Sequence, residues 1–258
     1  MVKVERGHHQ LMRDQELLPF IKEIKSLHPF WGYRRVWASL RYHHDFLVNQ
    51  KRVARLMKLY SLQVDSKRLK AKRASQTVKP KPDRPGEWWG IDMTKVMTDG
   101  GWVYVVLVLD WFTKRIVGYD ADYQSKSSHW LKALDMGVNE LFPDGVREQG
   151  LNLMSDNGSQ PTSRAFMKAC GLMGIKQAFT SYNNPKGNAD TERMIRTMKE
   201  ELLWLNEYGN LDELKRDLSG WVHDYNHNYL HSSLKYKTPA QAQEQFYLQE
   251  ANSFLNAA

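Results

Sequence analysis

The segment GWVYVVLVLDW, residues 101–111, constrains the fold more than any other part of the sequence. Its run of valine and leucine has almost no polar interruption, which is typical of a strand buried on both faces of a sheet. Helices must then cover both faces, so this one segment predicts a layered α/β architecture.

The surrounding pattern gives the order of the elements. Strands are predicted at 87–97, 101–111, 115–121, 151–155 and 175–181, and helices at 127–142, 162–174 and 188–206. Gly100-Gly101 predicts a hairpin, Ser127 an N-cap and Gly174 a helix end. Thr238-Pro239-Ala240-Gln241 predicts a capping box at the start of a later helix. Three strands followed by alternation indicate an α/β domain.

The first 85 residues differ from the rest of the chain in charge. Residues 1–85 hold 20 Lys and Arg against 7 Asp and Glu, a balance of +13, whereas the remainder carries −5. Apolar stripes predict short helices near 17–28, 32–43 and 49–62, the last with Asn49 as N-cap and Val53, Leu56, Met57 and Tyr60 on its apolar face. Short helices with a basic outer face indicate a helix-turn-helix that binds a polyanion. The alternative is that the basic side chains only form a solvated surface that aids solubility.

Composition limits the other possibilities. Cys170 is the only cysteine, which excludes an internal disulfide framework and a multi-cysteine zinc site. No apolar run approaches the roughly 20 residues that cross a bilayer, and the N-terminal residues are polar. We expect a cytoplasmic protein with no membrane partner. The expected organisation is a helix-turn-helix domain at 1–62, a basic linker at 63–86, a catalytic core at 87–206 and a helical extension at 207–258.

Three acidic residues stand in unusual places. Asp92 interrupts a predicted strand, Asp156 follows another strand at an Asn-Gly turn, and Glu192 lies near the start of a helix. Singly, they fit a strand end, an ordinary turn and a favourable helix dipole. If strands 87–97 and 151–155 are neighbours, however, all three converge. Converging carboxylates repel one another unless hard cations lie between them, which suits two Mg²⁺ or Mn²⁺ ions and phosphoryl transfer.

The spacing makes the pattern more specific, because 35 residues separate Asp156 and Glu192. Three segments surround the acids, namely WWGIDMTKV, SDNGSQPTSRAF and SYNNPKGNADTERMIRTMKEEL, and they are followed by YNHNYLHSSLKYKTPAQ. These segments resemble the DDE core of retroviral-integrase-like transposases. The front, HPFWGYRRVWASLRYHHDFLVNQKRVARLMKLYSL, is similar to the helix-turn-helix of OrfB-type insertion-sequence transposases. The resemblance covers residues from about 17 to 245.

The resemblance implies an RNase H-like core in which Asp92, Asp156 and Glu192 bind two Mg²⁺ or Mn²⁺ ions, with Asp92 bridging them. It implies a DNA transposase that hydrolyses a phosphodiester at a transposon end and then uses the freed 3′-OH to join that end to another strand. The implied partners are double-stranded DNA, as terminal inverted repeats and as target, further copies of the chain, and the product or fusion of an upstream open reading frame.

The resemblance also suggests which side chains meet DNA. The candidates are Arg34, Arg35, Lys51, Arg52, Arg55, Lys67, Arg68, Lys186, Arg196 and Lys199. Lys51, Arg52 and Arg55 are expected to be exposed, while helix packing is the alternative for Arg34 and Arg35. Asn157 and Gln160 are candidates for orienting the second acid or for touching the backbone. Tyr229 departs from the family, which usually has arginine there.

Three other functions compete with transposition. A nuclease of the same fold would hydrolyse without joining, and a DNA-binding regulator would retain an inactive core, although the three intact acids argue against that. A glycosidase with two carboxylates would need no divalent ion.

Overall fold

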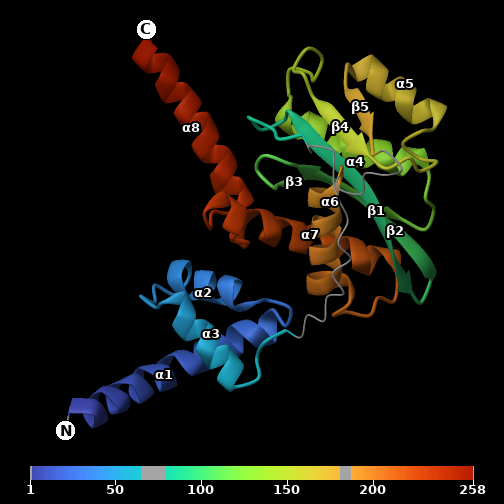
Figure 1. Ribbon diagram of the computed structural model, residues 1–258. Coiled ribbons are helices and arrows are strands. Elements are labelled where there is room, and N and C mark those ends of the chain that lie inside the picture. Colours follow the sequence, from blue (N-terminus) through green and yellow to red (C-terminus); the bar gives the residue numbers. More distant parts are fainter. Residues whose placement is uncertain (1, 65–79, 181–186, 258) are drawn as a thin grey trace. The chain divides into compact units, whose positions relative to one another are not determined.

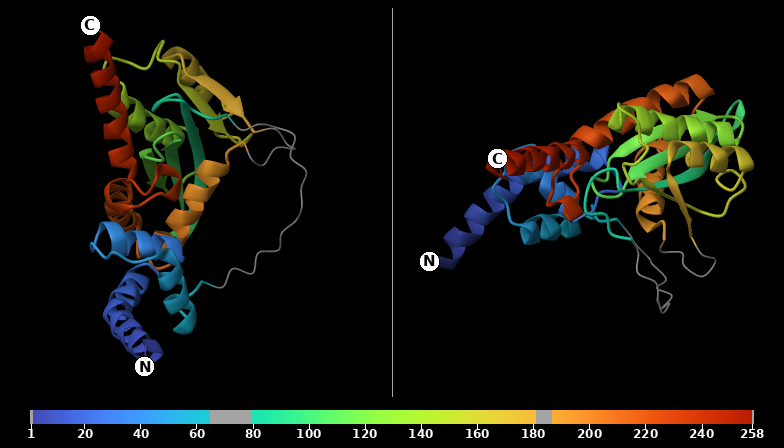
Figure 2. Two further views of the ribbon diagram at one scale, coloured as in Figure 1. Left: turned by 60° about the vertical axis from the view of Figure 1, so that its left-hand side comes forward. Right: turned by 90° about the horizontal axis from the view of Figure 1, so that it is seen from above.

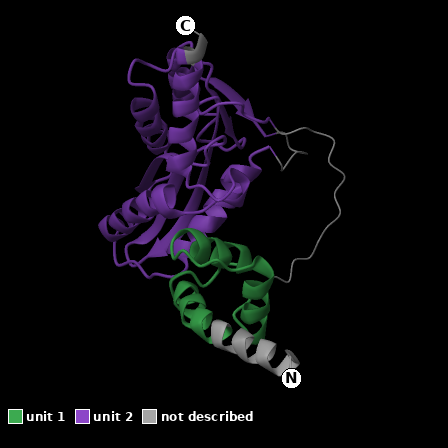
Figure 3. Cartoon of the chain, turned by 90° about the vertical axis from the view of Figure 1, so that its left-hand side faces the viewer, with its two compact units in different colours: residues 1–72 green, residues 73–258 purple. Residues whose placement is uncertain are grey.

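The computed structural model describes residues 2–64, 80–180 and 187–257. The chain divides into two compact units, residues 1–72 and 73–258 (Figure 3). The division falls within the segment predicted to be a linker, whose residues 65–79 lie outside the described parts.

The first unit contains three helices, α1 (Val2–Leu27), α2 (Tyr33–Tyr42) and α3 (Gln50–Leu59). Their apolar stripes form one small core, which includes Leu17, Ile21, Ile24, Val36, Leu40, Val53, Leu56 and Met57. The Asn49 side chain accepts a hydrogen bond from the Lys51 amide at 2.8 Å, which confirms the predicted cap. Tyr60, predicted to belong to the α3 stripe, is 45% exposed. Helix α1 also begins well before the predicted start.

The second unit is built on a five-stranded mixed sheet with the order β3-β2-β1-β4-β5 (Figure 1). The strands are β1 (Trp88–Thr98), β2 (Gly101–Asp110), β3 (Ile116–Asp122), β4 (Asn152–Ser155) and β5 (Lys176–Phe179). The first three are antiparallel and joined in sequence, and β4 and β5 add parallel to β1. The predicted hairpin is confirmed, with Gly101 at a φ of 111°.

Helices cover both faces of this sheet (Figure 2). On one face, Trp89 and Ile91 of β1 pack with residues of α4 (Ser127–Leu141) and α5 (Arg164–Met173) in the main core. Alternate residues of β1 face α6 (Ala189–Met198) on the other side. The residues of β2 from Val105 to Asp110 are all buried, so the sandwiched strand predicted from its sequence is confirmed.

Two helix ends test the local predictions. Gly174 ends α5 in the left-handed conformation, at a φ of 72°, as predicted. The prediction that Ser127 caps α4 is wrong. Lys126 occupies the cap position without a side-chain hydrogen bond, and Ser127 is the first helical residue.

Helix α6 continues as a π-helical turn, η1 (Lys199–Leu203), in which the Trp204 amide donates to the Lys199 carbonyl. The predicted helix over 188–206 is therefore correct in position, with an irregular second half. Both Leu202 and Leu203 are buried in this turn.

The remaining helices are α7 (Leu211–Asn228), the short 3-10 helix η2 (Ser232–Leu234) and α8 (Pro239–Ala257). Asn226 of α7 fixes this region to the sheet, because its amide bonds both the N–H and the carbonyl of Ile116. Thr238 and Gln241 exchange hydrogen bonds, which confirms the capping box. Within the described residues, no helix combines the length and apolar character needed to cross a membrane.

Candidate active site

Asp92 and Asp156 lie at the same edge of the β1–β4 pair. The strands run parallel, and their pairing register ends at Gly90 opposite Met154. Asp92 follows two residues later on β1, and Asp156 comes directly after β4. Since side chains of parallel strands run in step, this register brings both acids to one edge. Asp92 is half-buried and Asp156 is exposed.

Glu192 reaches this edge from the first turn of α6. Gly90 makes the approach possible, because a β-carbon there would lie 1.9 Å from Thr191 Oγ1 and 2.6 Å from Asn188 Oδ1. The glycine thus lets α6 sit directly on β1, on the same face as Asp92. Glu192 itself is exposed at the surface of α6.

The charges of the other two acids act on the Asp92 carboxyl. Burial, together with the negative charges of Asp156 and Glu192, raises the pKa of the Asp92 carboxyl from 3.8 to about 6. The backbone hydrogen bond from Met93 and the charge of Lys199 act in the opposite direction. Burial also raises the pKa of Glu192. The site therefore holds negative charge that it does not itself neutralise.

The donor set suits a hard divalent cation. Asp92 accepts a hydrogen bond from the Met93 amide at 2.7 Å, and Asp156 accepts one from the Gly158 amide at 3.0 Å, so each carboxylate keeps further lone pairs. Across the described parts of the chain, no group of three His, Cys, Asp or Glu side chains is arranged to hold a metal as it stands. The residue types fit such an ion, and the side chains of Asp156 and Glu192 are exposed.

Two basic residues follow Glu192 along the same helix. Lys199, at the junction of α6 and the π-helical turn, is half-buried and close enough for its charge to lower the pKa of Asp92. Arg196 points to solvent, with a side chain 62% exposed, and pairs with Glu200 at 2.7 Å. Of the two, Lys199 is the one whose charge acts on the acids.

The loop after β4 is ordered by its own polar side chains. Asn157 donates to the Thr180 carbonyl at 2.6 Å and Gln160 donates to Ser125 Oγ at 2.7 Å. Neither contact is to Asp156. Gly158 leaves room for that carboxylate, because a β-carbon there would lie 2.9 Å from Asp156 Oδ1.

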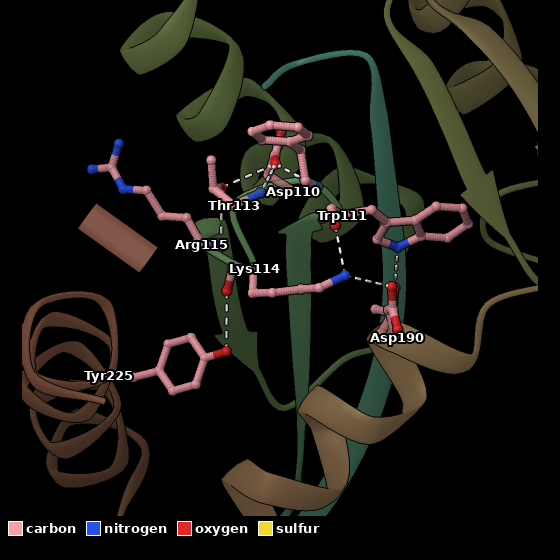
Figure 4. A network of polar contacts seen from close by, with 9 residues as sticks. Asp110, Trp111, Thr113, Lys114, Arg115, Asp190 and Tyr225 are labelled. Atoms are coloured by element: carbon pink, nitrogen blue, oxygen red, sulfur yellow. Dashed lines mark hydrogen bonds and ion pairs between the residues drawn. The ribbon is translucent and has the colours of Figure 1, made fainter. Parts of the chain in front are cut away.

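One buried aspartate was not among the residues predicted from the sequence. Asp110, at the end of β2, is 1% exposed and accepts hydrogen bonds from five donors of four residues, namely Gly86 N, Trp89 Nε1, Phe112 N, Thr113 N and Thr113 Oγ1. Burial nevertheless raises its pKa. An Asp followed at the third position by Thr is a turn signal that sequence reading could have used. This carboxylate organises the β2–β3 connection (Figure 4).

The basic candidates of the first unit fall into two groups. Arg34 is exposed over the ring of Tyr33, Arg35 is half-buried, and Lys51 is exposed. Arg52 and Arg55 both pair with Asp14 of α1, the Arg52 bond being 2.7 Å. Burial pushes the pKa of Asp14 upward, but the hydrogen bonds and charges of the two arginines outweigh it and lower the pKa. Arg52 was expected to be exposed and is half-buried in this pair.

Other residues singled out from the sequence lie apart from the acids or outside the described chain. Lys67, Arg68 and Lys186 belong to the undescribed segments. Tyr229, which replaces the usual arginine, is 5% exposed and packs against the rings of Tyr225 and His231.

Comparison with known proteins identifies the family. Integrase core domain models match residues 82–185 and 173–239, and an HTH-like domain model matches residues 12–70. InsK of Escherichia coli (strain K12), named as a transposase of insertion sequence element IS150, is 30% identical over 84% of this chain and 79% of its own length. The transposase of IS629 from Shigella sonnei is 27% identical over 92% of this chain and 82% of its own.

A solved structure agrees on the fold. A chain of the simian T-cell lymphotropic virus intasome, in complex with PP2A regulatory subunit B56 gamma, aligns with a TM-score of 0.54 at 16% identity, over 86% of this chain and 74% of that one. The RNase H-like fold and the resemblance read from the sequence are both confirmed. The chain belongs to the insertion-sequence transposases with an integrase-like core, and it is a DNA transposase, an enzyme of the polynucleotidyl transferase class.

Proposed function

We propose that Asp92, Asp156 and Glu192 form the catalytic site of this transposase, and that the site both cleaves and joins the ends of a mobile DNA element. The observation that carries the proposal is the register of β1 and β4, which brings Asp92 and Asp156 to one sheet edge, against which the first turn of α6 packs. Burial and the charges of Asp156 and Glu192 raise the pKa of Asp92 to about 6, which supports a site that takes a cationic ligand.

The three carboxylates would hold two Mg²⁺ or Mn²⁺ ions. Asp92 is the acid on which the charges of both other acids act. When bound, such ions polarise a phosphodiester and stabilise the attacking and leaving oxygens. The protein's own part is to hold the acids on three separate elements of the fold. Lys199, whose charge already acts on Asp92, would face the DNA end as it enters the site.

The chemistry consists of two displacements at phosphorus. In the first, a water oxygen bonds to the phosphorus at the element's end, the bond to the 3′-oxygen breaks, and a 3′-OH is left. In the second, that 3′-OH attacks a phosphodiester of the target and displaces another 3′-oxygen, which leaves with a proton. Each step forms one P–O bond and breaks one, so no covalent intermediate with the protein is required.

The first unit would supply DNA binding. Of the candidates in the described part of this unit, Arg34, Lys51 and Arg55 are exposed, and Arg52 and Arg55 pair with Asp14. We propose that this three-helix unit binds the terminal inverted repeats of the element, and that the chain acts as a multimer bridging two ends. We also propose that the product of an upstream open reading frame acts with this chain, as a partner or as a fusion.

A cleavage and strand-transfer assay tests the function. Labelled duplexes carrying the element's own end would be incubated with Mg²⁺, both uncut and with a precut 3′-OH. Transposition predicts cleaved product from the first and joined product from the second, both lost in Asp92→Asn. Cleavage without joining would indicate a nuclease, DNA binding without either reaction a regulator, and activity that persists in chelator would contradict the metal site.

A further inference from the structure

The first turn of α6, which carries Glu192, is attached to the sheet by three polar contacts. Trp111 Nε1 donates to Thr191 Oγ1 at 3.1 Å, and the Asn188 amide donates to the Ile91 carbonyl at 3.3 Å. The third contact is ionic, between Lys114 Nζ and Asp190 Oδ2 at 2.7 Å. Ile91 directly precedes Asp92, so these contacts set the position of one proposed metal ligand relative to another.

Lys114 joins this turn to the β2–β3 connection, which is itself held by several hydrogen bonds. Its ammonium also donates to the Trp111 carbonyl at 2.6 Å, so it spans from the end of β2 to α6 (Figure 4). The connection in which it lies is held by Asp110, through Phe112 and Thr113, and its own carbonyl accepts a hydrogen bond from Tyr225 of α7 at 3.0 Å. A side chain anchored on this connection has little freedom to follow α6 if the helix shifts.

The Lys114–Asp190 ion pair is largely shielded from solvent. Asp190 lies two residues before Glu192 in the first turn of α6. The side chains of the pair are only 20% and 27% exposed, so solvent screens the pair incompletely. The pair therefore ties the turn that carries Glu192 to the end of β2.

We propose that Lys114 is a positioning residue for catalysis, which holds Glu192 in register with Asp92 by clamping Asp190 to the end of β2. The inference rests on the proposed function, since it assigns Lys114 to the geometry of that metal site. Lys114 would act through Asp190 and the first turn of α6, and not by contacting the DNA or the metal.

The decisive variants are Lys114→Met and Lys114→Arg, with Lys132→Met, an exposed lysine on α4, as the matched control. Lys114→Met should lower kcat for end cleavage and raise the half-saturating Mg²⁺ concentration by about 10- to 100-fold, the range found when partners of metal ligands are removed. Its Kd for end DNA should not change. Lys114→Arg should restore most of the loss, and Lys132→Met should behave as the wild type.

A readout independent of activity is the rise in Tm that Mg²⁺ produces in the DNA-free protein. Lys114→Met should shift the Mg²⁺ dependence of that rise to higher concentration and speed hydrogen exchange of the first amides of α6. Equal Mg²⁺ dependence in Lys114→Met and wild type would overturn the positioning role.

A double-mutant cycle with Asp190→Asn separates positioning from packing, and the single Asp190→Asn variant tests the clamp by itself if Lys114→Met fails to fold. If Lys114 acts through Asp190, the single Asp190→Asn change shifts the Mg²⁺ dependence in the same direction, and the two changes together add little. Full additivity would contradict the clamp. A wild type without Mg²⁺-dependent cleavage, or an active Asp92→Asn, would instead overturn the proposed function.

Discussion

Asp92 and Asp110 are two aspartates of the same sheet in opposite circumstances. Asp110 is enclosed, and its oxygens accept five hydrogen bonds that join β2 to the start of β1 and to the β2–β3 connection. Asp92 accepts a bond from its neighbouring amide and faces two further acids. A buried carboxylate surrounded by donors is a structural element, whereas one facing other carboxylates marks a site that awaits a ligand.

The largest expected effect is on catalysis. Asp92→Asn should reduce end cleavage by about a thousandfold or more, given that losing a single group that stabilises the transition-state charge already costs 10²- to 10³-fold. The variant should fold and bind end DNA normally, and Asp144→Asn, at an exposed loop position, should retain full activity. A gel-based rate measurement under single-turnover conditions checks this, and residual activity within tenfold of wild type would remove Asp92 from the site.

Replacing Asp110, in contrast, should lower the stability of the fold. Asp110→Ala leaves several buried donors without an acceptor and should lower the free energy of unfolding by about 3–5 kcal/mol. Urea denaturation measures this, with Asp144→Ala expected within about 0.5 kcal/mol of wild type. If Asp110→Ala is as stable as the wild type, the proposed contrast between the two aspartates fails.

The pH dependence of stability distinguishes Asp92 further. Its folded pKa of about 6 lies above the usual 3.8, so its ionisation destabilises the folded state as pH rises from about 4 to 6. Above that range, and without divalent ions, Asp92→Asn should be more stable than wild type by on the order of 2 kcal/mol. Below pH 4 the two should agree. Urea midpoints across pH 3.5–8 give the comparison, and Mg²⁺ should reduce the difference.

Gly90, two residues before Asp92 on β1, offers a further test of the contrast. Gly90→Ala places a methyl group against Thr191 and Trp111, which should destabilise the fold by about 1–3 kcal/mol. It should also displace α6 and raise the Mg²⁺ concentration needed for cleavage. Gly171→Ala, where a β-carbon meets nothing within 4 Å, is the matched control. Wild-type Mg²⁺ dependence in Gly90→Ala would show that α6 tolerates the shift.

Local chemistry explains which features could be predicted from the sequence. The Asn49 cap, the Gly174 helix end and the Thr238–Gln241 capping box each depend on residues a few positions apart. The buried β2 strand follows from its uninterrupted apolar run. The adjacency of β1 and β4, and with it the meeting of Asp92 and Asp156, was expected from the order of the strands and from the family resemblance.

The features that were missed depend on contacts distant in sequence. Asp110 gains its importance from Gly86 and Trp89, which lie more than 20 residues before it. Lys114 meets Asp190 across 76 residues, and Arg52 meets Asp14 across 38. No periodicity reports such pairs, so the basic residues of α3 were expected in solvent. The Ser127 cap failed because serine at that position became the first helical residue instead.

The π-helical turn after α6 has a consequence for how the chain tolerates changes in length. A turn closed from Trp204 to Lys199 contains one residue more than an α-helical turn, as an insertion would leave it. Such a turn spreads its extra residue over about the same rotation as an α-helical turn, so deleting one residue between 199 and 203 would restore regular α-helix and leave the direction of Trp204 relative to Glu192 nearly unchanged. The wide turn thus absorbs one residue without changing the angular phase between the acid-bearing helix and the chain that follows it.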